Sequence, residues 1–354
     1  MKSAVTGRDL YESLTMRLTD RIPLYASAVI STADPSGLLD VLVERTQHCD
    51  DPGELLLIDD VLAALSANEV LAERVLTCQG TLRSRFGKFD PRLFPEAMFV
   101  RLPGGRFDLG SPQGQGEANE WPQHPVQVSA FAMACTPITV RQYRCFWPSH
   151  RMEIDDTVQC IGKWKGRRIA DSDESYDDLP VTYASHLAAR MFCRWLDWNR
   201  QQLECLQESE VPCLPSEAEW EFAVRAGAQG WSVWSCPEDR LDEHAWTMRN
   251  AQNRPHAVGR KHPNGFGLFD MHGQVWEWCE DAYRPYPTDG ELRVDPLVLG
   301  SSAVWRVLRG GSFVNLPGFC RSAFRVRNLP AVALRLNGFR VVLAARSRAG
   351  LGYR

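Results

Sequence analysis

Residues 305–343 read WRVLRGGSFVNLPGFCRSAFRVRNLPAVALRLNGFRVVL, and this stretch carries more information about the fold than any other. It combines a framework of arginines, glycines and serines with apolar side chains that follow neither the period of a strand nor that of a helix. Pro317, Gly318, Pro330 and Gly338 interrupt regular structure, which predicts that most of the stretch is loop. Because apolar side chains in a loop have no regular face on which to be buried, the pattern indicates a binding surface.

The composition is that of a soluble globular protein, with 354 residues of which 44% are hydrophobic and 24% are charged. A net charge of -4 provides no basic excess, so we expect neither a nucleic-acid nor a membrane partner. The N-terminus lacks the apolar core of a signal peptide, which favours a cytoplasmic location. The 11 cysteines are odd in number and contain no CxxC pair, so we expect most of them to be reduced and buried.

Residues 1–90 have the pattern of a small all-α domain. Three stretches, 10–22, 37–49 and 54–76, repeat apolar residues at steps of three and four, as in Leu55, Ile58 and Leu62. One apolar stripe on each helix predicts a helical bundle with its own core. The segment contains no recognisable catalytic constellation, so we interpret it as an adaptor or oligomerisation unit through which a partner could bind.

Residues 91–354 change to short strand-like runs separated by turns and isolated helices, which predicts an α+β domain. The run from 98 to 111 suggests a β-hairpin around Pro103. Residues 178–202 contain a helix with Phe192 and Trp195 on one apolar face.

Local capping signals locate two further helices in this domain. One helix is expected to begin near Thr139. A second begins at Ser216, whose side chain caps the first turn while Glu219 reaches back to the Ser216 backbone N–H. Gly227 is placed to end that helix.

Four motifs in the order and spacing seen here resemble the formylglycine-generating enzyme (sulfatase-modifying factor) family. They are LPSEAEWEFAVRAG (214–227), PNGFGLFDMHGQVWEWCED (263–281), RVLRGGSFVNLPGFCRSAFR (306–325) and NGFRVVL (337–343). The resemblance extends from about residue 94 to residue 345 and implies a C-type-lectin-like fold, in which the C-terminal segment forms part of the ligand site. Because that fold hosts both enzymes and binding proteins, the fold alone does not decide the function.

The residues that correspond to the copper site of the enzymes argue against catalysis. In the family's oxidases two cysteines follow the Gly-Gly-Ser turn and bind copper(I), a soft metal that prefers thiolates. The equivalent positions here are Asn315 and Cys320, so one ligand is missing. We therefore expect no copper and no enzymatic activity, and a formylglycine-generating-type copper oxidase of cysteine is kept as the alternative.

The same C-terminal segment closely resembles the variable region of diversity-generating retroelement proteins, in which mutagenesis of adenines turns asparagine codons into any codon ending in C. This resemblance implies a receptor-like protein with a hypervariable surface, lying within 305–343, that binds a protein or another macromolecule. The implied ligand-binding residues are Phe313, Val314, Asn315, Leu316, Gly318, Phe319, Phe324, Val326, Arg327, Asn328, Leu329, Ala331, Val332, Ala333, Leu334, Leu336 and Asn337.

Several of these residues also admit a structural interpretation. Val332, Leu334 and Leu336 alternate like a strand, for which burial and ligand contact are equally compatible with the pattern. Phe313 occupies a position where relatives have a scaffold tryptophan. Phe319 and Phe324 are expected to contact the ligand and to contribute little to stability.

The arginines of this stretch are mostly assigned to the framework, where guanidinium groups tie loops to carboxylates and carbonyls. Arg327 and Arg335 are the two exceptions, and they are expected to face a ligand. A surface that mixes apolar and guanidinium groups suits a protein better than a sugar.

A metal site is suggested by FDMHGQVWEWC at residues 269–279. The family resemblance implies a structural calcium ion held by the Asp270 and Glu277 side chains and by the Gly273 and Val275 carbonyls, an oxygen set that suits a hard cation. The alternative is a hydrogen-bonded turn without metal, with the neighbouring tryptophans in the core.

Overall fold

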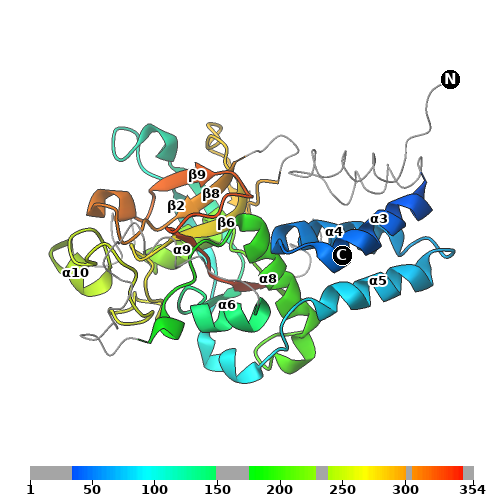
Figure 1. The fold of residues 1–354 in the computed structure, drawn as a ribbon. Helices are drawn as coiled ribbons and strands as arrows, with labels where there is room; N and C mark the ends of the chain where they lie inside the picture. Colours follow the sequence, from blue (N-terminus) through cyan, green and yellow to red (C-terminus); the bar gives the residue numbers. More distant parts are fainter. Residues whose placement is uncertain (1–33, 149–174, 229–237, 300–304, 346–354) are drawn as a thin grey trace.

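The computed structural model describes residues 34–148, 175–228, 238–299 and 305–345. Within these ranges, helices at the N-terminal end lie beside a body of three small sheets, short helices and long connections (Figure 1). The α+β fold class expected from the sequence is thereby confirmed. The helix expected over 10–22 lies outside the described residues.

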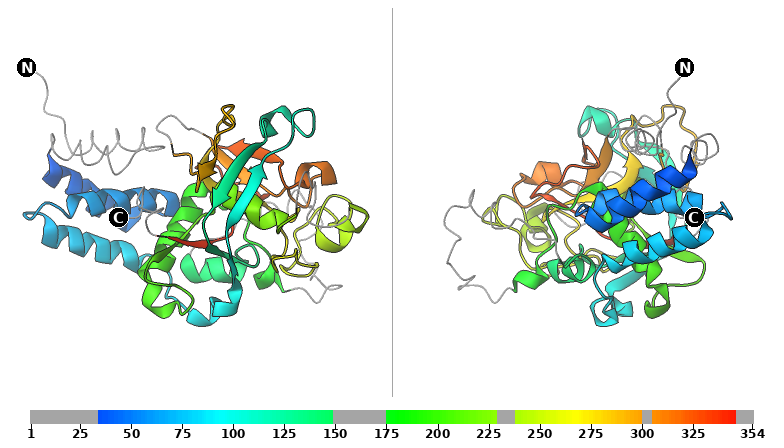
Figure 2. Two further views of the ribbon diagram at one scale, coloured as in Figure 1. Left: turned by 180° about the vertical axis from the view of Figure 1, so that it is seen from behind. Right: turned by 45° about the vertical axis from the view of Figure 1, so that its right-hand side comes forward.

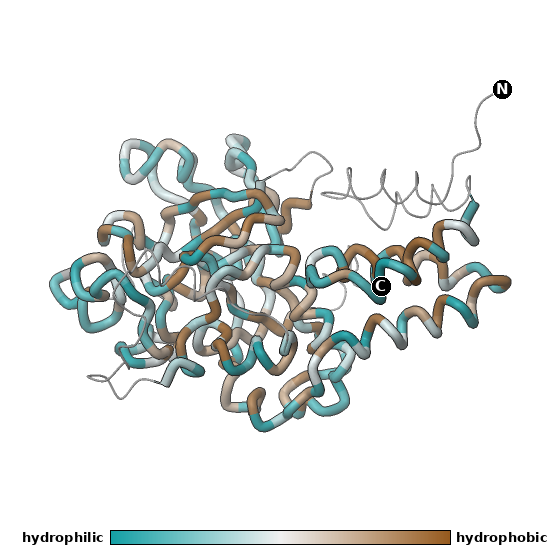
Figure 3. The backbone as a smooth tube through the Cα atoms, viewed as in Figure 1, coloured by the Kyte–Doolittle hydropathy of each residue, from teal (hydrophilic) through white to brown (hydrophobic). Residues whose placement is uncertain are grey.

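Three helices make up the N-terminal layer: α3 (Pro35–His48), α4 (Pro52–Leu65) and α5 (Ala72–Ser84). Asp34 and Asp51 accept hydrogen bonds from the first backbone N–H groups of α3 and α4, and a proline occupies the first position of each helix. The stretch 54–76 was expected to be continuously helical, but it is divided by turns after Leu65. In Figure 3 the three helices alternate between hydrophobic and hydrophilic residues, as amphipathic helices do.

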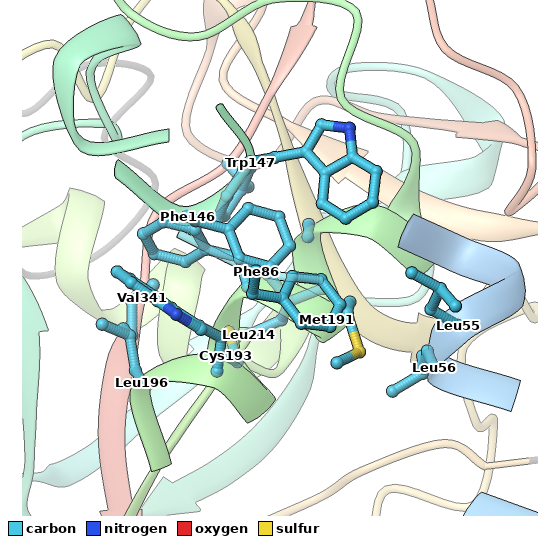
Figure 4. Packing of buried hydrophobic residues seen from close by; sticks show 14 of the residues in the cluster. Leu55, Leu56, Phe86, Phe146, Trp147, Met191, Cys193, Leu196, Leu214 and Val341 are labelled. Atoms are coloured by element: carbon cyan, nitrogen blue, oxygen red, sulfur yellow. The ribbon is translucent and has the colours of Figure 1, made fainter. Parts of the chain in front are cut away.

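The N-terminal layer packs on α8 (His186–Trp198) and shares one apolar cluster with α8, α6 (Val140–Phe146) and parts of two sheets. A second apolar cluster lies around β2 (Gly105–Leu109), β3 (His124–Val128) and α9 (Glu217–Arg225). Figure 4 shows Leu55 and Leu56 of α4 facing Met191 of α8. A buried ion pair accompanies this apolar contact, because the Arg194 guanidinium lies 3.0 Å from Asp59 and 2.7 Å from Asp60.

The three sheets are assembled from strands that are distant in sequence, and Figure 2 shows them from two further directions. The first has the order β1 (Phe99–Leu102), β4 (Phe131–Ala134), β11 (Val342–Ala345), β5 (Glu210–Cys213). The second has the order β10 (Asn337–Gly338), β6 (Trp276–Ala282), β8 (Arg306–Arg309), β9 (Arg325–Asn328). The third has the order β2 (Gly105–Leu109), β3 (His124–Val128), β7 (Arg293–Val294).

The hairpin expected over 98–111 is wrong. Strand β1 pairs with β4, whereas β2 pairs with β3 in another sheet, so the two strands separated by Pro103 do not pair with each other. Gly104 and Gly105 adopt positive φ angles of 69° and 150°, and the chain crosses from one sheet to the other at this point. The turn signal therefore predicted a break between two strands, but the pairing of those strands with each other was wrong.

The remaining helices follow their local signals. Helix α6 (Val140–Phe146) begins after Thr139 with a reciprocal capping box, and α9 (Glu217–Arg225) begins after Ser216 in the same way. These two starts confirm the sequence prediction, and α9 ends at Ala226 and Gly227 in left-handed backbone conformations. The short elements are η1 (Pro91–Leu93), η2 (Glu96–Met98), η3 (Ala118–Glu120), η4 (Tyr176–Asp178), η5 (Arg200–Gln202), η6 (Glu238–Arg240), α10 (Leu241–His244) and η7 (Pro317–Cys320).

We predict that Arg194→Leu lowers the free energy of unfolding by about 3–5 kcal/mol at pH 7, because it leaves two buried carboxylates unpaired. Burial already raises the pKa of Asp59 from 3.8 to about 6. Between about pH 4 and pH 6 the folded protein therefore holds a proton on Asp59 that the unfolded chain has released. The stability lost through Arg194→Leu should shrink as the pH falls from 7 towards 4, because a protonated carboxyl group needs no cationic partner. Urea unfolding at several pH values measures both effects.

Asp59→Asn and Asp60→Asn in the Arg194→Leu background are the matched control. They should recover part of the stability at pH 7 and abolish the pH dependence of the loss. An equal loss with and without the asparagines would show that the ion pair does not connect α4 to α8.

Candidate functional site

Two glycines close the turn after β8, and a side chain at either position would strain the backbone. Gly310 and Gly311 have φ angles of 96° and 79°, in the left-handed region. A Cβ atom on Gly311 would lie 2.4 Å from the Cys320 Sγ atom. The Gly310 carbonyl accepts a hydrogen bond of 2.7 Å from the Gly273 N–H, which fixes the turn to the segment before β6.

Buried arginines hold the loops that follow this turn. Arg309 bonds the Ala323 and Phe324 carbonyls at 2.7 and 2.8 Å and pairs with Glu221. Arg325 forms two hydrogen bonds with the Glu217 carboxylate, at 2.7 and 2.6 Å.

Arg321 and Arg340 are held in the same manner, by Glu120 and Glu277 respectively. The framework role expected for these four arginines is therefore confirmed by their partners.

The framework presents a set of solvent-exposed positions from the C-terminal segment. Leu316, Phe319 and Leu334 are 53%, 42% and 43% exposed, although each is a large apolar side chain. Together they mark an exposed apolar surface on irregular backbone. The exposed members of the predicted ligand-binding set are Leu316, Gly318, Phe319, Arg327, Ala331, Ala333 and Leu334. Its partly exposed members are Val314, Asn315, Val326, Asn328, Leu329, Val332 and Leu336. We call these fourteen residues the display surface.

Three residues of the predicted set do not belong to this surface. Phe313 is 2% exposed and Asn337 is 2% exposed, the latter because it pairs with Trp276 in the sheet. Phe324 is 8% exposed, since its ring lies 5.2 Å from the Phe319 ring and 6.1 Å from the Trp276 ring. The expectation that the Phe324 ring faces a ligand is therefore wrong, and the ring packs edge to face against Phe319 instead.

The alternation of Val332, Leu334 and Leu336 does not produce a strand. Residues 329–336 are turns and coil, and the Leu334 carbonyl accepts a hydrogen bond of 3.0 Å from the Tyr183 N–H. The Pro330 carbonyl accepts one of 3.3 Å from the Leu187 N–H. This part of the display surface is thus attached to the start of α8.

Residues outside the C-terminal segment also border the display surface. Met248 is 55% exposed, and its N–H donates to the Asn315 carbonyl at 2.9 Å. Asn253 accepts a hydrogen bond of 2.9 Å from Arg335. Sequence reasoning assigned neither of these two residues to the site, because nothing in the local sequence links 248 or 253 to the C-terminal loops. Trp305, at the start of the C-terminal segment, is 41% exposed.

The positions equivalent to the copper cysteines are held in other contacts. The Asn315 side-chain oxygen accepts a hydrogen bond of 2.5 Å from the Ser312 hydroxyl. Cys320 is fully buried, and burial raises the pKa of its thiol to about 12, so it is not a thiolate at neutral pH. The His272 ring donates from Nδ1 to the Cys320 carbonyl at 2.8 Å, and burial lowers the pKa of that imidazole to about 4.

Some of the oxygens expected to bind calcium have other partners. Both carboxylate oxygens of Glu277 accept hydrogen bonds of 2.7 Å from Arg340, and one of them also accepts 2.7 Å from the Trp220 indole. Asp270 Oδ2 accepts from the Gly259 N–H at 2.8 Å, and burial raises the pKa of Asp270 to about 6. Asp270 Oδ1 is buried and has no hydrogen-bond partner among the described residues. The calcium ion and the hydrogen-bonded turn without metal therefore both stay predictions.

A wider search of the described residues finds no group of three or more histidine, cysteine, aspartate or glutamate side chains arranged around a metal. The nine cysteines in those ranges form no disulfide bond, and seven of them are buried.

Residues 86–345 match the family described as the sulfatase-modifying factor enzyme 1-like domain. The chain belongs to this family. The match begins between the helical layer and β1, so the helices before residue 86 lie outside it.

Relatives in this family include proteins named as enzymes and proteins named as inactive. The formylglycine-generating enzyme of Streptomyces coelicolor is 29% identical over 68% of this chain and 87% of its own length. The inactive C-alpha-formylglycine-generating enzyme 2 of Mus musculus is 25% identical over 70% of this chain and 85% of its own. The serine/threonine-protein kinase Pkn1 of Chlamydia trachomatis is 28% identical over 70% of this chain, but the match covers only 38% of that protein.

Two solved structures share the fold. Treponema denticola variable protein 1 has a TM-score of 0.56 and 24% identity, covering 69% of this chain and 94% of that chain. PvdO from Pseudomonas aeruginosa has a TM-score of 0.53 and 24% identity, covering 69% and 93%. The fold expected from the four sequence motifs is confirmed by these matches. No helix in the described parts of the chain is long and apolar enough to cross a bilayer.

We predict that Gly311→Ala destabilises the protein by roughly 2–4 kcal/mol, because the added methyl group meets Cys320 in a left-handed backbone conformation. Urea unfolding measures this loss. Gly318→Ala is the matched control on the same segment, where a Cβ atom meets nothing within 4 Å, and it should leave stability unchanged. Equal effects of the two substitutions would contradict the described packing of the turn.

Proposed function

We propose that this protein is a non-catalytic, receptor-like binding protein whose display surface contacts a macromolecular ligand. The observation that carries this proposal is the exposure of Leu316, Phe319 and Leu334 on a segment whose backbone is fixed by buried arginines. Exposed apolar side chains cost free energy in an isolated protein, and large clusters of them mark interaction sites. A pre-organised backbone lowers the entropy lost when a ligand binds.

The distribution of exposure supports a second part of the proposal, that the display surface is diversified by a retroelement. Most of the predicted ligand-binding residues, which mutated asparagine codons can encode, lie at the surface. The arginine and glycine framework between them is largely buried. A system that randomises residues needs this separation, because a substitution in the framework would unfold the protein. The fold shared with Treponema denticola variable protein 1 is consistent with such a system.

We propose a protein as the ligand. The surface combines aliphatic side chains, the Phe319 ring and the exposed Trp305, and tryptophan, phenylalanine and arginine are enriched at protein interfaces. We also propose a cytoplasmic location, which suits a protein whose described cysteines form no disulfide bond.

The helical layer is proposed to organise or pass on the binding event, and it offers a surface for a second partner. Helix α8 connects the two parts. The Leu187 N–H in its first turn donates to the Pro330 carbonyl, the Tyr183 N–H just before it donates to the Leu334 carbonyl, and the side chains of α8 pack against α4. A displacement of residues 330–334 would therefore act on a helix that is shared with the N-terminal layer.

The alternative function is that of a copper oxidase of cysteine, which the name of the Streptomyces coelicolor relative suggests. It is disfavoured because Asn315 replaces one of the two copper ligands and because the Cys320 thiol is buried and protonated. Titration with copper(I) and incubation with a cysteine-containing peptide discriminate the two functions. Tight copper(I) binding together with oxidation of the peptide would overturn the non-catalytic proposal. A fixed structural partner protein is the third option, and it requires no variation over 305–343.

Sequencing of the DNA around this gene tests the diversified surface. We expect a near-copy of codons 305–343 that differs at adenines, together with a gene for a reverse transcriptase. The differing codons should include those of Leu316, Phe319 and Leu334 and exclude those of the buried arginines. A locus without such a copy would contradict diversification and would leave a binding protein of fixed specificity.

A further inference from the structure

The arginines of the C-terminal segment fall into two classes according to whether a carboxylate neutralises them. Arg309, Arg321, Arg325 and Arg340 each pair with a glutamate. Arg327 and Arg335 form no ion pair with any of the described residues, although a guanidinium is charged at every physiological pH. Both lie at the surface of a protein whose net charge is -4, so they are not part of a general basic excess.

Aromatic rings hold both unpaired guanidinium groups in place. Arg327 on β9 lies over the Tyr283 ring at 5.0 Å and over the Trp305 ring at 5.3 Å. Arg335 lies over the Phe313 ring at 5.2 Å and donates to the Asn253 side-chain oxygen at 2.9 Å. A guanidinium stacked on an aromatic face keeps its N–H groups directed outward and available, and it loses little conformational entropy on binding.

The two arginines enclose part of the display surface along the chain. Between them lie the exposed Ala331, Ala333 and Leu334, which offer only apolar groups to a ligand. Along the chain, these exposed apolar side chains are thus preceded by one unneutralised cation and followed by another.

We propose that Arg327 and Arg335 are anchor points for carboxylates, so that the ligand of the display surface is an acidic protein or peptide with apolar side chains between its acidic groups. This inference rests on the proposed binding function and adds the chemical class of the ligand. An arginine pairs with a carboxylate through two parallel hydrogen bonds, which fixes the orientation of the partner. Complementary charge also accelerates association and rejects partners of the wrong sign.

Nucleic acid is the other polyanion that arginines bind, and the structure favours a protein over it. Binding to a phosphate backbone depends on neutralising several phosphates in a row. Arg327 on the display surface and Arg335 beside it are only two cations, and the exposed side chains between them, Ala331, Ala333 and Leu334, are aliphatic.

Selection of a phage-displayed random dodecapeptide library on the full-length protein tests the proposal. We expect enriched peptides to contain two or more aspartates or glutamates around apolar residues. Affinity for a synthetic consensus peptide should fall roughly 10-fold or more in Arg327→Gln/Arg335→Gln and should weaken with added salt. Arg106→Gln is the matched control, because Arg106 is exposed, donates a hydrogen bond of 3.2 Å to the Gln127 amide oxygen and forms no ion pair with the described residues, and it should leave affinity unchanged.

A Phe319→Ser variant separates this inference from the proposed function. Peptides that lack acidic residues and bind in a manner sensitive to Phe319→Ser, but not to the double arginine substitution, would overturn the acidic ligand and retain the display surface. Binding of the selected peptides that neither Phe319→Ser nor the double arginine substitution weakens would contradict both the acidic ligand and the display surface as the binding site. Tighter, Arg327- and Arg335-dependent binding of a single-stranded oligothymidylate than of any selected peptide would overturn the choice of a protein ligand.

Discussion

The pairing of buried arginines with buried glutamates is the interaction on which the rest of this structure depends. Glu217 and Glu221 of α9 hold Arg325 and Arg309, which belong to neighbouring strands of the β6–β8–β9 sheet. Removing such charges from water costs several kcal/mol for each ion, so well-packed apolar side chains of similar volume would often stabilise a core as much or more. The effect of these ion pairs is geometric, because each guanidinium fork fixes the directions of several backbone groups at once.

That geometry explains how irregular backbone can stay ordered without a regular hydrogen-bond ladder. Arg309 alone satisfies the Ala323 and Phe324 carbonyls, which would otherwise be buried without partners. The shape of the loops between β8 and β9 therefore does not depend on the exposed apolar side chains that they carry. Their exposed positions can carry whatever a ligand requires, provided that Gly311, Cys320 and the arginines stay in place.

The sequence predicted local features well and partners poorly. The helix starts after Thr139 and Ser216 were predictable because a capping box involves residues only three apart. The partners of β1 and β2 were not, because each strand pairs with a segment beyond its own turn. For the candidate site, the unpatterned apolar residues correctly indicated exposure for Leu316 and Phe319. The burial of Phe324 depends on Trp276, from a distant strand, and no local pattern could predict it.

The central claim is that the framework folds independently of the side chains on the display surface, and thermal unfolding of two variants tests it most directly. Leu316→Ser, Phe319→Ser and Leu334→Ser combined in one protein should lower Tm by no more than about 5 °C, since these side chains are largely exposed. Phe324→Ser alone should lower it by about 10 °C, because it removes a buried ring. A triple variant that loses as much stability as Phe324→Ser, or more, would contradict the account, because the display surface would then be part of the core.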